Sequence, residues 1–231
     1  MIFEEMNLDA TLNSEQLTEL WLPEQEWLQA KNSRHPTVIR VHRAISWLAE
    51  AEVALLEDTQ VVLRWIGLNS LFGRWDEAER KPCGDRKSLH CFLDQVWTLD
   101  VQSGGKKLQA VVEGLEPLVL KILDHQWLQN VFWKAPSVDR AQRRTQNWRD
   151  APLQYAEGKH RLVFERTLDY VYFLRCQLVH GAATANSSMN RDSVVWCNRF
   201  LSHAMSGILE VIIQHGAGLD WGELCYPPVE G

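Results

Sequence analysis

The sequence predicts an all-α protein. Apolar residues recur at helical spacing along most of the 231 residues, whereas strand-like alternation is scarce and no Asn-Gly or Asp-Gly pair separates two apolar runs. Hydrophobic residues make up 45% of the chain and 11 residues are Trp, so we expect helices whose contacts are filled by indole rings. A chain of this size can form one substantial domain, and we interpret residues 1–231 as a single helical domain.

Charge and cysteine content limit the classes of function. The formal net charge is −6, which argues against a broad nucleic-acid-binding face, because such faces are usually basic. Any contact with nucleic acid is therefore expected to be local. Five scattered cysteines argue against a disulfide framework and for a reducing compartment. Because no apolar run has the length that spans a bilayer, and the acidic start lacks the basic segment of a secretory signal, we expect a cytoplasmic protein outside the membrane.

An N-terminal arm is the first predicted element. Within residues 1–35, Asn13 and Gln16 have the spacing of a helix capping box, and Pro23 is expected to interrupt the helix that this box begins. Helices are expected after the arm at residues 37–57, 61–72 and 89–101, in two short pieces within 107–134, and at 137–150, 161–180 and 190–214.

Breaks in the helical pattern delimit these segments. Gly73 closes one helix, and the polar residues 74–87 are expected to form a loop. Gly181 stands where a C′ glycine ends a helix. Asn190 is expected to cap the last predicted helix, and residues 216–231 are expected to form an irregular tail.

The helix over residues 161–180 contains the strongest local conflict in the sequence. Between Leu168 and Val179 nearly every residue is apolar. Side chains of this kind around the whole circumference predict burial on all sides, inside the domain or against a second subunit. Arg175 and His180 nevertheless lie on this helix, and a buried Arg is costly unless it is paired or hydrated. Such conflicts tend to mark functional sites.

Helical geometry favours a site shared by two chains. Arg175 and His180 are five residues apart, so they point about 140° away from each other on a regular helix. Two copies of the helix packed about a two-fold axis would place both residues of each copy at one cleft. Cys176 lies on the same face as His180. Asp169 is about 16 Å from His180 along the helix axis, too far to orient its imidazole within one chain.

One six-residue segment, Arg175 to His180 (RCQLVH), resembles the R-x4-6-H motif of the HEPN (higher eukaryotes and prokaryotes nucleotide-binding) family. The likeness includes the adjoining Gly181 and the start of the next helix at Asn190 and Arg191. The earlier segment 65–73 (WIGLNSLFG) resembles a core helix of several HEPN groups.

The resemblance covers about residues 37–73 and 160–215. It implies an all-α, HEPN-like helical bundle with additional N-terminal and central helices. The HEPN-like core would span residues 37–215, with a helical insertion at about 87–150 and with the arm of residues 1–35 in front of it.

The resemblance also implies an activity, that of a metal-independent endoribonuclease which dimerises through the helix at residues 161–180. His180 would act as general base on the ribose 2′-hydroxyl of RNA or as general acid on the leaving oxygen. Histidine can take part in both ways, because an imidazole ordinarily changes its protonation state near neutral pH. Arg175 would stabilise charge on the phosphoryl oxygens, and the product would be a 2′,3′-cyclic phosphate. No cofactor is expected, the setting is that of a toxin or a host-defence protein, and an antitoxin or a regulatory protein is a candidate partner.

Two other hypotheses stay open. The first is a catalytically inactive HEPN scaffold that binds a nucleotide or a partner protein. Cys176 favours it, because active members commonly carry a polar residue after the Arg, and so does the net charge of −6. The toxin subgroup paired with nucleotidyltransferase antitoxins has a Tyr two residues after the His, where this chain has Ala182. The second is an unrelated helical adaptor that uses Trp-rich surfaces.

Each candidate site residue also has a purely structural interpretation. His180 could complement the negative end of its helix, and Arg175 could belong to an ion pair in the core. Cys176, a supporting residue of the site, could be a small buried apolar side chain. The other two supporting residues are Asn190, which could act only as a helix cap, and Asn69, which could bond to backbone instead of to the motif helix.

Basic residues and potential metal ligands occur outside the motif. The candidate RNA contacts are Arg140, Arg143, Arg144 and Arg191. The first three share one helical face, and such faces are more often simply solvated. Cys83, His90 and Cys91 are potential zinc ligands but lack the paired cysteines of a structural zinc site, so no metal is expected.

Overall fold

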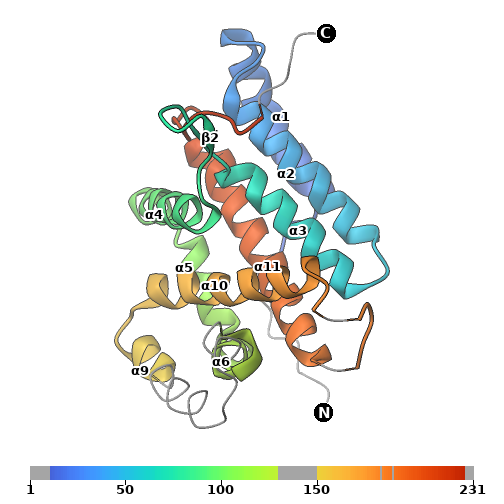
Figure 1. The fold of residues 1–231 in the computed structure, drawn as a ribbon. Helices are drawn as coiled ribbons and strands as arrows, with labels where there is room; N and C mark the ends of the chain where they lie inside the picture. Colours follow the sequence, from blue (N-terminus) through green and yellow to red (C-terminus); the bar gives the residue numbers. More distant parts are fainter. Residues whose placement is uncertain (1–10, 130–149, 183, 189, 227–231) are drawn as a thin grey trace.

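Helices form nearly all of the regular structure in the computed structural model, which describes residues 11–129, 150–182, 184–188 and 190–226 (Figure 1). The α-helices of these residues are α1 (Ser14–Lys31), α2 (Pro36–Val53), α3 (Glu57–Phe72), α4 (Asp85–Ser103), α5 (Lys107–Gly114), α6 (Glu116–Asp124), α9 (Ala151–Ala156), α10 (His160–Val179) and α11 (Arg191–Val211). The remaining elements are short: β1 (Trp75–Asp76), β2 (Lys81–Pro82), the 3-10 helix η1 (Gln126–Leu128) and the π-helix η2 (Ile212–Gly216). The predicted all-α class is confirmed.

Helix α1 packs against α2 and α11. The Asn13 side chain accepts a hydrogen bond from the Gln16 N–H at 2.9 Å, and the Gln16 side chain accepts one from the Asn13 N–H at 3.0 Å. The predicted capping box is therefore confirmed. Pro23 lies inside α1, so the prediction that it interrupts the segment is wrong. A Pro in a helix interior costs about 3 kcal/mol, and the burial of Trp21 and Leu28 offsets that cost.

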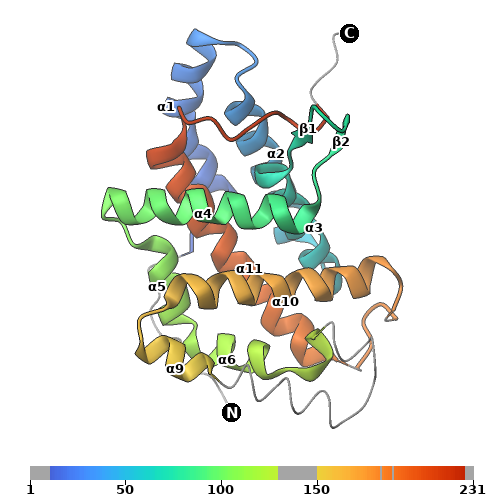
Figure 2. The same ribbon diagram turned by 60° about the vertical axis from the view of Figure 1, so that its left-hand side comes forward.

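Helices α2 and α3 pack along each other, and α11 lies against α3 (Figures 1 and 2). Gly67 in α3 makes this approach close. A Cβ added there would lie 2.9 Å from the Met205 Cε of α11 and 3.1 Å from the Ala44 carbonyl oxygen of α2. The absence of a side chain at Gly67 therefore lets three helices meet at native packing density.

Helix α11 is the centre of the fold. It contacts α1, α3, α4, α5, α6 and α10, and most of its residues are buried. Glu210 is also buried on it and pairs with Lys107 of α5 at 2.7 Å. A helix apolar on nearly all sides belongs in a core, and the other elements are arranged around it.

Helix α10 lies across α11 and packs against α3, α4, α5, α6 and α9 (Figure 2). It runs antiparallel to α4. Arg161 pairs with Asp94 at 2.6 Å near one end of the contact, and Asp169 pairs with Arg86 at 3.0 Å towards the other. The helix predicted at residues 137–150 falls almost entirely outside the described residues.

The predicted loop after α3 and the predicted C-terminal tail are joined by backbone pairing. Strands β1 and β2 pair antiparallel, and Leu224 of the tail forms an isolated bridge with Arg74 beside β1. Arg40 of α2 is 2% exposed and holds these segments together. Its guanidinium donates to the carbonyl oxygens of Ser70, Leu71, Gly73, Gly222 and Glu223, at 2.8–3.4 Å. Burial lowers the pKa of Arg40 to about 10, so the side chain remains a cation near neutral pH.

Candidate functional site

The motif helix α10 buries one face within the chain. The buried side chains of this face are Val163, Phe164, Thr167, Leu168, Tyr170, Val171 and Leu174. On the other side of its C-terminal half, Tyr172, Phe173 and Leu178 are only partly buried, and Val179 is 50% exposed. The described residues therefore do not surround this helix on all sides. Of the two kinds of burial that were predicted, complete burial inside the domain is wrong. Contact with a second subunit stays a prediction.

The two predicted catalytic residues lie on this open part of α10. Arg175 is partly buried, and it takes part in no ion pair or hydrogen bond within the part of the chain that the structure describes. The interpretation of Arg175 as a member of a core ion pair is therefore not supported. His180 is exposed and occupies the C-cap position, where its backbone N–H donates to the Cys176 carbonyl at 3.0 Å.

Gly181 ends the helix as predicted. Its φ of 69° is in the left-handed region, which glycine adopts at no steric cost. The N–H of Gly181 donates to the Leu178 carbonyl at 3.2 Å, and the N–H of Ala182 donates to the Gln177 carbonyl at 2.8 Å. The Gln177 side chain also donates to the Trp127 carbonyl at 2.7 Å, so the helix end is held in place beside η1.

A phenol and a thiol adjoin Arg175. Burial raises the pKa of Tyr172, the neighbouring Cys176 raises it further, and the positive charge of Arg175 opposes the rise. The Tyr172 ring lies 5.6 Å from the Trp65 ring of α3. Segment 65–73 thus packs against the motif helix. Cys176 is partly exposed, so it is not simply a buried apolar residue.

Asp169 is bound by α4. Its carboxylate accepts hydrogen bonds from Arg86 Nε at 3.3 Å and from Arg86 Nη2 at 3.0 Å, and it lies 3.1 Å from His90 Nε2. As the helical rise predicts, Asp169 does not orient His180. Nothing in local sequence spacing could have paired Arg86 with a carboxylate 83 positions away.

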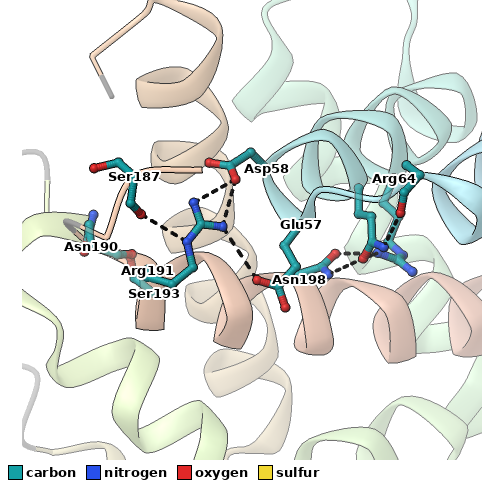
Figure 3. A network of polar contacts seen from close by, with 10 residues as sticks. Glu57, Asp58, Arg64, Ser187, Asn190, Arg191, Ser193 and Asn198 are labelled. Carbon is teal, nitrogen blue, oxygen red and sulfur yellow. Dashed lines mark hydrogen bonds and ion pairs between the residues drawn. The ribbon is translucent and has the colours of Figure 1, made fainter. Parts of the chain in front are cut away.

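Arg191 is held in a network of ion pairs at the start of α11 (Figure 3). Its guanidinium binds the Asp58 carboxylate through Nη1 and Nη2, both at 2.8 Å, and lies 3.6 Å from Glu57. Its Nε donates to the Ser187 carbonyl at 3.2 Å. Arg191 therefore ties the loop after His180 to the first turn of α3, and its charge is already paired within the chain.

Neither supporting asparagine makes the side-chain hydrogen bond expected of it among the described residues. Asn190 precedes α11 as predicted, but it has a φ of 65° and its side chain makes no cap hydrogen bond. The prediction of a side-chain cap is wrong, because a capping residue ordinarily has an extended backbone and Asn190 has a left-handed one. The Oδ1 atoms of Asn190 and Asn69 are both buried without a hydrogen-bond partner among the described residues.

Other polar groups near the site were missed at the level of sequence. Arg64 of α3 is buried and bonds to Asn198 of α11, while Asn198 donates to Gln60 at 2.7 Å (Figure 3). Burial lowers the pKa of Arg64. The signal in the sequence was Arg64 itself, a charged residue on the otherwise apolar stripe of α3. The candidate RNA contacts Arg140, Arg143 and Arg144 lie outside the described residues.

The potential zinc ligands Cys83, His90 and Cys91 do not form a metal-binding group. Across the described ranges, no three His, Cys, Asp or Glu side chains are gathered as ligands. None of the helices in the same ranges is both long and apolar enough to cross a membrane. Comparisons of the chain with protein-family models, with curated proteins and with solved structures gave no match.

Proposed function

We propose that the chain is a metal-independent endoribonuclease of the HEPN type, which cleaves RNA with Arg175 and His180 in a toxin or host-defence setting. The proposal rests on the surroundings of Arg175. It is a partly buried arginine that no described carboxylate pairs with, five residues before an exposed histidine. Its guanidinium is therefore available to a phosphate, and its planar set of donors matches phosphoryl oxygens.

The chemistry needs an imidazole in each protonation state. A neutral His180 takes the proton of the ribose 2′-hydroxyl, and the 2′-oxygen attacks the adjacent phosphorus. The bond from phosphorus to the 5′-oxygen breaks, and a protonated imidazole gives its proton to that leaving oxygen. Arg175 stabilises the charge on the phosphoryl oxygens in the transition state. The products are a 2′,3′-cyclic phosphate and a free 5′-hydroxyl.

A second copy of the chain would supply the second imidazole. Within one helix Arg175 and His180 point about 140° apart, so a single copy presents them poorly to one phosphate. The open side of α10, with Val179 half-exposed, is the surface through which two copies would meet. A two-fold axis there brings both histidines and both arginines to a shared cleft, and light scattering is expected to report a dimer. A strictly monomeric protein would contradict the composite site.

The alternative function is an inactive HEPN scaffold that binds a nucleotide or a partner protein. The observation that favours it is Cys176, a partly exposed thiol that directly follows Arg175. This places a soft, weakly polar group where a stronger hydrogen-bonding residue would assist phosphate chemistry. The net charge of −6 favours the scaffold as well, because it disfavours RNA over most of the surface.

Cleavage of total RNA by the purified protein in EDTA tests the proposal. Arg175→Ala and His180→Ala are each expected to slow cleavage at least about a hundredfold, the usual contribution of a general acid–base or an oxyanion-stabilising group. Arg199→Ala and His42→Ala are matched controls, because both residues are exposed on other helices; these variants should cut RNA at the parental rate.

Two outcomes would contradict the proposal. One is unchanged cleavage in both site variants. The other is failure of the parental protein to cut any RNA together with measurable binding of a nucleotide or a partner protein, which would support the scaffold.

A further inference from the structure

The face of α10 that carries His180 extends from this residue towards the N-terminal end of the helix. Cys176 and Phe173 precede His180 by four and seven residues, so the three side chains lie on one stripe. Phe173 is about 10 Å from His180 along the axis. Its ring is partly exposed and meets the Tyr172 ring at a centroid distance of 5.9 Å. An aromatic surface therefore adjoins the proposed catalytic residue.

Arg86 of α4 covers the far end of this stripe. Its guanidinium carbon lies 5.8 Å from the centre of the Phe173 ring, and the side chain is 50% exposed. A guanidinium has five N–H donors, and the bonds to Asp169 use those of Nε and Nη2. Arg86 thus keeps donors for another acceptor while Asp169 holds it above the ring.

Two arginines near these rings can contact an anionic ligand. Arg86 lies over the Phe173 ring and Arg175 acts on Tyr172, whereas Asp85 and Asp169 are the carboxylates beside them. The carboxylate of Asp169 is shared by Arg86 and by His90. Arg175, which has no ion-pair partner among the described residues, and the remaining donors of Arg86 are the groups that can contact phosphates here.

We propose that Arg86, Tyr172 and Phe173, here called the α4–α10 surface, bind an unpaired segment of RNA beside the scissile phosphate. One base stacks on the part of the Phe173 ring that Arg86 leaves exposed, and Arg86 donates to a phosphate of the same strand. The ligand is single-stranded, because a base within a duplex is stacked on its neighbours and cannot lie on a side-chain ring. This inference rests on the proposed ribonuclease function and adds the form of the substrate and the residues that select it.

Binding in the His180→Ala background tests the α4–α10 surface without cleavage. The probe is a fluorescently labelled, unstructured RNA, compared by anisotropy with the same strand annealed to its complement. Single-stranded RNA is expected to bind more tightly. Arg86→Gln should lower the slope of log affinity against log salt by roughly 0.7, the value for one lost contact to a single strand. Arg199→Gln removes an exposed arginine from α11 and should leave the slope unchanged.

Phe173→Leu tests the stacking step separately. Leucine keeps an apolar side chain against Tyr172 and removes the ring, so single-stranded RNA should bind about tenfold more weakly while circular dichroism shows an unchanged helical content. Equal affinity for single strand and duplex, or an unchanged salt slope in Arg86→Gln, would overturn the inference. Cleavage by the parental protein separates the two proposals. If the parental protein cleaves RNA but its affinity for RNA does not depend on Arg86, only the α4–α10 surface is refuted. If RNA binding depends on Arg86 but no cleavage occurs, only the catalytic proposal is refuted.

Discussion

Separating Arg191 from Asp58 is expected to destabilise the fold by an amount that the geometry allows us to estimate. Both terminal nitrogens of Arg191 lie 2.8 Å from the same carboxylate oxygen, and the two side chains are 24% and 12% exposed. The pair is thus intermediate between exposed pairs, which contribute about 0.2–1 kcal/mol, and buried pairs, whose disruption costs about 3–5 kcal/mol. We expect a coupling energy of about 1–2 kcal/mol between Arg191 and Asp58.

A double-mutant cycle measures this coupling energy. Arg191→Gln, Asp58→Asn and the double variant are unfolded in urea, with Trp fluorescence as the signal and linear extrapolation of the free energy of unfolding. Glu79 and Lys81 form the control pair, because they are 3.1 Å apart but 62% and 64% exposed. A coupling energy for Arg191 and Asp58 no larger than that of the control pair would refute the reasoning. The same variants should also cut RNA more slowly, since Arg191 holds the loop after His180.

Three further predictions concern packing, burial and backbone conformation. Gly67→Ala should lower the free energy of unfolding by about 1–3 kcal/mol in urea titration. The new methyl group would lie 3.1 Å from the Ala44 backbone oxygen, which cannot move aside as the end of the Met205 side chain can. Gly207→Ala, with only ordinary 3.4 Å contacts, should show no such loss. Burial lowers the pKa of His203, so the unfolded state binds more protons than the folded state. The free energy of unfolding should therefore fall as the pH drops below about 6.5. The free energy of unfolding of His203→Gln should depend less on pH. Asn190→Gly should keep the fold, because the φ of 65° at this position suits glycine. Reduced RNA cleavage with unchanged thermal stability would show that the Asn190 side chain supports the site. Unchanged cleavage would show that only the backbone conformation matters.

Local signals predicted the helices well. The capping box at Asn13 and the glycine at Gly181 act within one turn of the chain, so the residues that form each feature are close together in the sequence. The helix predicted over residues 161–180 is observed at His160–Val179. Arg175 and His180 were singled out for a similar reason, because a charged Arg175 on an apolar helix is visible from sequence alone. Their roles stay predictions.

Long-range contacts account for the features that were missed. Pro23 is accepted within α1 because the apolar side chains around it are buried, and burial is a property of the whole fold. The acidic partner of Arg191 is 133 positions away, so an exposed basic residue could not be told from a paired one. The partial exposure of Phe173 depends on which side of α10 the other helices cover, and periodicity could not choose that side.

The chemistry of the RNA ends tests the central claim most directly. An RNA with one preferred cleavage position is incubated with the protein in EDTA, and the fragments are identified by mass spectrometry. The account predicts a 2′,3′-cyclic phosphate and a 5′-hydroxyl, no such fragments with His180→Ala, and no cleavage when the 2′-hydroxyl at that position is replaced by hydrogen. Cleavage of the 2′-deoxy substrate, or fragments with a 5′-phosphate and a 3′-hydroxyl, would contradict the role of His180 as a base on the ribose.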